Sequence, residues 1–225
     1  MYDSRNPHAS LSLVTPPAAE PVALADAKLY ARISTTADDA IVSDLIQTAR
    51  EWLEVWTRRA FVIQTWLLTL DNFPIFYDWY EWSPYQTTAP YQSAQQWQTQ
   101  NIIRLPVPPL QSVTSIEYVD ATTGVLASLA ADLYQVDVAS EPGRIAPAYA
   151  TFWPTAQASI GSVKIQFVAG YDLAGGAKVP SRVLTAIKLA VSSWYQNREM
   201  AGLPLSEQPL ALRSVANSLK WGNYV

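Results

Sequence analysis

Few side chains in this 225-residue sequence have the types and spacing that catalysis or metal binding requires. Its single histidine, His8, lies in a polar N-terminal stretch, and cysteine is absent. A Ser–His–Asp or Cys–His device needs a positioned imidazole, and zinc sites are built largely from His and Cys ligands. The sequence therefore predicts neither a nucleophilic triad nor a metal centre of this kind.

Two acidic pairs remain as candidates for a hydrolytic site that uses carboxylates alone. Asp38 and Asp39 open a helical pattern, where acids are suited to cap the first turn. Asp132 and Asp137 flank a short strand pattern, where solvation explains them more simply. The Gly-Gly-Ala-Lys run at 175–178 lacks the spacing of a phosphate-binding loop and is better explained as a hinge. We therefore expect no enzyme and no cofactor.

The composition indicates a folded, acidic protein. Hydrophobic residues make up 49% of the sequence, which includes nine tryptophans, so a sizeable core is expected. The net charge of −4 and the pI near 5.0 disfavour a basic surface that binds nucleic acid. Residues 1–10 lack the apolar core of a signal peptide. No apolar run reaches the roughly 18 residues of a membrane span, so we expect no membrane partner.

Two long stretches show the i, i+3/i+4 apolar spacing of amphipathic helices. The first begins at Asp38 and has Arg58 and Arg59 in its last turn. The second begins at Ser181, expected as its N-cap, and ends within 197–202. A shorter helix is expected over 22–33, and the wide apolar faces of the long helices should pack together. In the first long stretch the apolar positions are Ile41, Val42, Leu45, Ile46, Ala49, Trp52, Leu53 and Trp56, and the polar face carries Ser43, Asp44, Gln47, Arg50, Glu51 and Glu54.

Between these helices, residues 61–172 have β-branched and aromatic patterns typical of a small antiparallel β domain. We expect five or six strands there, and a short edge strand at 11–14. The fold class is α+β, with an antiparallel helical bundle from residues 21–60 and 178–202. An N-terminal arm (1–20) and a C-terminal tail (203–225) extend from it, the arm being either frayed or docked on a neighbour. The expected strands cover 61–70, 102–105, 113–119, 125–129, 132–137 and 163–169.

Residues 72–100 form a long segment rich in Tyr and Trp, without Lys or Arg. Three readings are open: an extended hairpin packed on the body, a protruding loop buried by another subunit or tail protein, and a platform that stacks sugars. The protruding loop is favoured, since Tyr and Trp bring large contact area at low entropic cost. Its expected contact residues are Tyr77, Trp79, Tyr80, Trp82, Tyr85, Tyr91 and Trp97.

The C-terminal tail ends in apolar and aromatic residues that have few ways to bury themselves. We expect docking on a partner rather than packing against the chain's own body. The residues expected to make this contact are Leu219, Trp221, Tyr224 and Val225.

A series of short motifs in this order resembles the head–tail connector (adaptor) family of tailed phages and gene transfer agents. The series spans nearly the whole chain, although residues 72–100 are longer than expected for the family, so the resemblance implies no role for them. The motifs are LVTPPA at 13–18, LADAK at 24–28, DD at 38–39, ARE at 49–51, TRRA at 57–60, QTW at 64–66, LPVPPLQSV at 105–113, FVAGY at 167–171 and WYQNRE at 194–199.

The resemblance implies a non-enzymatic structural protein of the virion, assembled in the host cytoplasm and located in the neck. Such adaptors form a ring, usually a dodecamer, that binds the portal on one side and a stopper or tail protein on the other. DNA passes through the ring without sequence-specific binding, and the C-terminal segment reaches the portal. The alternative from the residues themselves is a carbohydrate- or host-receptor-binding module that uses the Tyr/Trp-rich segment.

Overall fold

The computed structural model describes residues 9–74, 101–173, 178–197 and 210–220, and the structural statements below concern these residues. The chain divides into two compact units, each built from segments far apart in the sequence. The helical unit comprises residues 15–64, 106–109 and 169–225, and the β unit comprises 1–14, 65–105 and 110–168. The α+β class expected from the sequence is confirmed.

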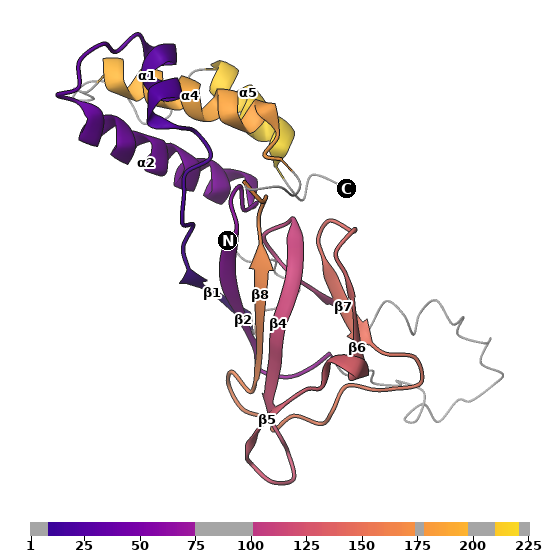
Figure 1. The fold of residues 1–225 in the computed structure, drawn as a ribbon. Helices are drawn as coiled ribbons and strands as arrows, with labels where there is room; N and C mark the ends of the chain where they lie inside the picture. The colour runs from indigo at the N-terminus through magenta and orange to yellow at the C-terminus, as the bar shows by residue number, and fades with distance from the viewer. Residues whose placement is uncertain (1–8, 75–100, 174–177, 198–209, 221–225) are drawn as a thin grey trace. The chain divides into compact units, whose positions relative to one another are not determined.

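The helical unit contains helices α1 (Leu24–Ala31), α2 (Asp39–Thr57), α4 (Ser181–Gln196) and α5 (Leu210–Leu219) (Figure 1). Helix α2 packs against the other three helices, and α4 packs against α1 and α5. The expected pairing of the two long amphipathic helices is therefore confirmed. The core contains Val42, Ile46, Ala49 and Leu53 of α2, Val183, Ala186, Ile187, Ala190 and Val191 of α4, and Leu212, Ala216 and Leu219 of α5.

Several details at the helix ends differ from the sequence-based expectation. Asp38 occupies the N-cap position of α2, but its side chain makes no capping hydrogen bond. Pro180, not Ser181, is the N-cap of α4. Helix α2 ends at Thr57, and Arg58 follows as a left-handed C-cap with a φ of 56°. The expectation that Arg58 and Arg59 lie in the last turn was therefore wrong, and Ile41, expected on the apolar face, is exposed.

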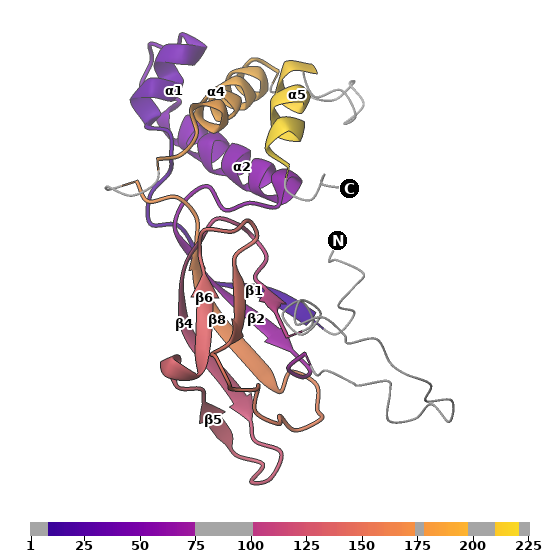
Figure 2. The ribbon, with the colours of Figure 1, turned by 90° about the vertical axis from the view of Figure 1, so that its right-hand side faces the viewer.

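The β unit contains one sheet with the strand order β1-β2-β8-β4-β5 and another with the order β3-β7-β6. Figure 2 shows β8, a late strand, between β2 and β4 in the first sheet. The strands are β1 (Ala9–Thr15), β2 (Gln64–Leu70), β3 (Ile103–Arg104), β4 (Leu110–Val119), β5 (Leu126–Ser128), β6 (Tyr134–Asp137), β7 (Arg144–Pro147) and β8 (Val163–Ala169), with a 3-10 turn, η2 (Ala131–Leu133), before β6.

The strand pattern was largely visible in the sequence. Strand β8 has the expected bounds, and β1 is the edge strand expected around 11–14. The described part of 61–172 holds seven strands rather than five or six. Strand β2 begins at Gln64 instead of Phe61 because Phe61 is buried in the core of the helical unit. Residues 75–100, most of the aromatic segment, lie outside the described residues.

Candidate interaction surfaces

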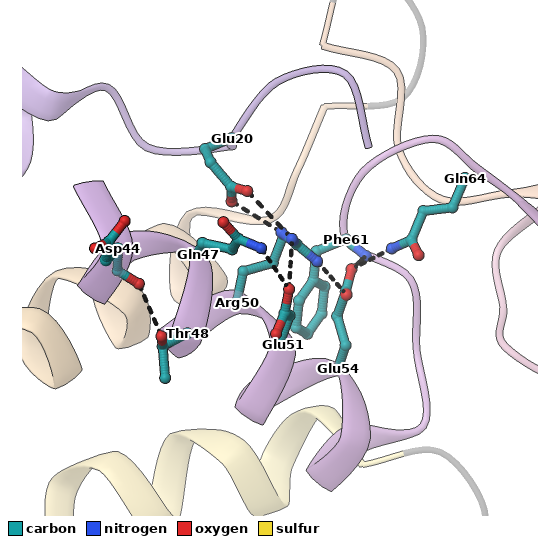
Figure 3. Close-up of polar contacts among 9 residues, drawn as sticks. All are labelled: Glu20, Asp44, Gln47, Thr48, Arg50, Glu51, Glu54, Phe61 and Gln64. Carbon is teal, nitrogen blue, oxygen red and sulfur yellow. Dashed lines mark hydrogen bonds and ion pairs between the residues drawn. The ribbon is translucent and has the colours of Figure 1, made fainter. Parts of the chain in front are cut away.

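A buried charged cluster centres on Arg50, a residue of the face of α2 that the sequence predicts to be polar. Its side chain is only 5% exposed. Arg50 Nε and Nη2 donate to the two carboxylate oxygens of Glu20 at 2.8 and 3.1 Å, and Nη1 donates to Glu54 Oε2 at 2.7 Å (Figure 3). Burial would lower the pKa of Arg50, but Glu20 and Glu54 outweigh it and the pKa is raised. The guanidinium therefore stays charged and joins the segment before α1 to the middle of α2.

Glu54 extends the same cluster to the chain that leaves α2. Its Oε1 accepts hydrogen bonds from the Phe61 backbone N at 2.8 Å and from Gln64 Nε2 at 2.6 Å. Burial raises the pKa of Glu54, against the opposing effects of the Phe61 hydrogen bond and of Arg50. The Glu54 carboxylate thus binds both Arg50 of α2 and the residues that lead into β2.

Three chain segments that lead toward β strands meet near this cluster, within the helical unit. Ala60 N donates to Pro108 O at 3.1 Å, and Gly170 N donates to Pro109 O at 2.9 Å. Gly170 has a φ of +114°, and a Cβ placed there would lie 2.0 Å from Val62 O. A glycine is therefore required for this close approach.

Polar contacts fix helix α5 to the end of α2, next to a cluster of aromatic rings from α2 and α4. The Trp52 and Trp56 rings stack with centroids 5.5 Å apart, and Trp194 of α4 packs edge-on against Trp52 at 6.3 Å. Trp56 Nε1 donates to Asn217 Oδ1 at 3.1 Å. Arg59 Nε donates to the Leu219 carbonyl at 2.9 Å, so this arginine complements the C-terminus of α5 and not that of its own helix.

Three of the four acids considered for catalysis have structural partners, and the fourth, Asp132, is exposed. Asp38 accepts a hydrogen bond from the Tyr195 hydroxyl at 2.6 Å, and Asp39 pairs with Lys28. Asp137 accepts from Ser140 Oγ at 2.6 Å and from Arg144 Nε at 2.7 Å, which hold the pKa of its carboxyl well below its usual range. Within the described ranges, no three His, Cys, Asp or Glu residues are grouped to hold a metal ion. No helix in these ranges combines the length and apolarity that a membrane span needs.

Most of the contact residues expected from the sequence lie outside the described residues. This applies to Trp221, Tyr224 and Val225 of the tail. Leu219 is described, and it is 7% exposed in the core of the helical unit, where α5 packs on its own chain. The residues outside the described ranges also include Tyr77, Trp79, Tyr80, Trp82, Tyr85, Tyr91 and Trp97.

The β unit carries apolar side chains that none of the described residues covers. Tyr149 is 94% exposed, on a turn that Thr151 closes by donating its N–H to Ala148 O at 3.0 Å. Phe152, at 75%, follows this turn. Exposed side chains of this size are typical of contact surfaces when they gather. Smaller groups are Leu13 and Val14 of β1, Val125 and Leu126 at β5, and Leu133, Val136 and Val138 around β6.

No family model and no curated protein matches the sequence. Among solved structures, a chain of the neck of an empty gene transfer agent (GTA) particle, computed with C6 symmetry, is similar over 94% of this chain and 95% of that chain, with a TM-score of 0.66 and 21% identity. A chain of the native GTA virion is similar over 93% and 94%, with a TM-score of 0.66 and 20% identity.

A chain of the neck of the native GTA particle, computed with C12 symmetry, is similar over 94% of both chains, with a TM-score of 0.59 and 20% identity. At such coverage the likeness includes both the helical unit and the β unit. The resemblance drawn from the short motifs therefore extends to the fold.

Proposed function

We propose that this chain is a structural subunit of the neck of a phage-like particle, a head–tail adaptor that assembles into a ring and catalyses no reaction. The observation that carries the proposal is the fold likeness over 93–94% of the chain to chains of GTA necks and virions. Sequence motifs in the same order support it independently. The proposed location is the neck of the virion.

The ring is proposed as a dodecamer between a portal protein and a stopper or tail protein. The C6 and C12 symmetries of the neck structures that contain the neighbours support a closed ring. Head-to-tail rings need two different complementary patches on each subunit, and uncovered apolar side chains occur at several places on the β unit. The negative net charge suits a channel through which DNA slides, because phosphate-binding Lys and Arg would retain it.

The tail residues Trp221, Tyr224 and Val225 are proposed to bind the portal. Arg59 and Trp56 support this by fixing the end of α5, so that residues 221–225 start from a defined point. Leu219 then acts as the anchor of the tail in its own core rather than as a portal contact.

The proposal is tested by co-expression of the full chain with the portal protein of the same particle. Purification through a tag on the portal, followed by negative-stain imaging, should give rings of this chain attached to portal rings. A chain that stays monomeric at every concentration and does not co-purify with the portal contradicts the proposal. Binding of such a monomer to a glycan array would favour the carbohydrate-binding alternative.

The proposed contact role of Tyr77, Trp79, Tyr80, Trp82, Tyr85, Tyr91 and Trp97 has its own test. Residues 80–95 are replaced by a Gly/Ser segment of equal length, which removes the aromatic area and keeps the spacing. The subunit should retain its melting transition while ring formation weakens. Loss of the transition would instead show that these aromatic side chains belong to the core.

A further inference from the structure

Strand β1 is an edge strand whose exposed end has no protection against pairing. Its seven residues, Ala9–Thr15, contain no charged residue and no proline. Leu13 is 45% exposed and Val14 is 49% exposed. Since successive side chains of a strand point to opposite faces, each face has an apolar side chain at this end that is about half exposed. Natural edge strands usually carry a charge, a proline or a bulge that prevents association, so β1 has the properties of a strand that pairs.

Strand β6 is a second unprotected edge in the β unit. It pairs with β7 from Tyr134↔Pro147 to Asp137↔Arg144, and no other described strand adjoins it. Its single charged residue, Asp137, is engaged by Ser140 and Arg144 of its own chain. The edge therefore presents main-chain hydrogen-bonding groups without a free charge to repel an incoming strand.

Apolar side chains surround the β6 edge. Val136 on the strand and Val138 after it are exposed, as is Leu133 before it. The turn that carries Tyr149 is held beside Leu133, whose carbonyl accepts from Ala148 N at 3.0 Å and from Thr151 Oγ1 at 3.2 Å. An uncharged strand with apolar side chains on both faces would cover this surface, and β1 is such a strand.

The other two sheet edges are less suited to receive a strand. Strand β3 has two residues, of which Arg104 is exposed, and prolines at 106, 108 and 109 follow it closely. Strand β5 has three residues and ends a hairpin with β4. In Figure 1, β1 and β6 lie on opposite sides of the β unit. Pairing between copies through these edges is therefore head-to-tail, which is the geometry that closes into rings.

We propose that β1 of one copy adds to the β6 edge of the next copy, so that Leu13 and Val14 cover the apolar surface around Val136 and Tyr149. This inference rests on the proposed ring and specifies its subunit interface. The partner is a second copy of this chain, and main-chain hydrogen bonds between the strands supply the contact, as in other strand-addition complexes.

The absence of cysteine allows a direct test by cross-linking in the full-length chain. Ser12→Cys in β1 and Gln135→Cys in β6 both replace exposed residues. A chain with both substitutions, assembled with the portal and treated with a short bis-maleimide, should give a ladder of covalent oligomers. A mixture of the two single variants, one enlarged by a tag, should give only the mixed dimer, which excludes cross-links within one copy.

The controls separate the alternative pairings. A Ser12→Cys and Ser128→Cys chain tests the β5 edge, and Ser12→Cys alone tests β1–β1 pairing. A ladder from the first control, a covalent dimer from the second, or rings in the micrographs without a ladder from the β1–β6 pair would overturn the inference and leave the proposed function standing. Absence of rings, of portal co-purification and of any ladder would overturn both.

A charge on the edge provides an independent test. Leu13→Lys places a cation on the exposed end of β1, where it opposes strand addition. The variant should lose the ring in size-exclusion chromatography and keep the melting temperature of the wild-type subunit. Rings that persist in this variant would contradict the inference.

Discussion

Arg50 and Glu20 face each other across a bidentate ion pair, with Arg50 Nε 2.8 Å from Glu20 Oε2 and Nη2 3.1 Å from Oε1. Arg50 lies in the middle of α2, whereas Glu20 lies 30 residues earlier, before α1 begins. The same guanidinium also binds Glu54, whose other oxygen binds the segment that enters β2. Chain segments on both sides of α2 are thus tied to one buried cation.

Substitution of Arg50 should be strongly destabilising. Arg50→Ala leaves Glu54 buried without its cation, and breaking a buried ion pair in this way costs about 3–5 kcal/mol. We expect the lower end of that range, because Glu20 is partly exposed. Urea denaturation gives the free energy of unfolding. As a control, Arg182→Ala at an exposed position of α4 should change it by less than about 0.5 kcal/mol, and equal effects of the two substitutions would contradict the prediction.

The stability of the helical unit should depend on pH through Glu54. Burial raises the pKa of Glu54 above its ordinary value of 4.5, so the folded chain holds this proton more tightly than the unfolded chain. The contribution of Glu54 to stability is therefore complete below pH 4.5 and is lost as pH rises through the raised pKa. Arg50 and Glu20 are the charged groups that face it.

Glu54→Gln isolates this contribution, because an amide of the same shape does not titrate. The free energy of unfolding of the wild type minus that of Glu54→Gln should decrease as the pH is raised from 4 to 7. A pH-independent cost of the substitution shifts this difference but leaves its slope unchanged. A difference that grows with pH would show that Glu54 binds its proton less tightly in the folded state.

Gly170 should tolerate no side chain. A Cβ there would lie 2.0 Å from Val62 O and 2.8 Å from Ile63 N, and both atoms belong to the backbone. We expect Gly170→Ala to cost more than about 3 kcal/mol, since strain and clash add. Gly124→Ala is the matched control, because Gly124 also has a positive φ but no atom near its Cβ position. It should cost about 1 kcal/mol, and a ranking of the two in the reverse order would contradict the prediction.

Trp56 should hold α5 in place. Trp56→Phe keeps an aromatic ring beside Trp52 and removes the donor to Asn217, a loss of about 1 kcal/mol. Amide hydrogen exchange of residues 210–219 should accelerate, while exchange in β8 stays as in the wild type. Trp153→Phe removes a comparable indole bond, to Asn101 O in the β unit, and should leave the exchange of α5 unchanged.

Removal of the tail should separate folding from portal binding. A chain that ends at Lys220 keeps Leu219 in the core and its contact with Arg59. It should melt as the wild type does and fail to co-purify with the portal, because Trp221, Tyr224 and Val225 are the proposed contacts. Restoring the same length with Gly and Ser should not restore binding. Undiminished portal attachment of the shortened chain would place the contact elsewhere.

The sequence predicted helices and strands well where their apolar residues recur with one regular spacing. The apolar spacing of α2 and α4 and the alternation in β8 depend only on neighbours a few residues away, so they are visible in the sequence. Phe61 shows the limit: its β-branched and aromatic neighbours favour a strand, but burial in the helical core decides otherwise. The motifs also predicted the fold likeness, because their order along the chain is itself a sequence property.

The sequence by itself determined the α+β class, the pairing of the amphipathic helices, the absence of cysteine and the presence of a single histidine. Only the tertiary structure decided that Arg50 and Glu54, predicted on a polar face, form a largely buried ion pair in the helical unit. It also decided that Arg59 complements α5 rather than α2, and that β1 and β6 are edge strands of their sheets. The reason is that each of these depends on a partner far along the chain, whose approach is set by packing and not by local spacing.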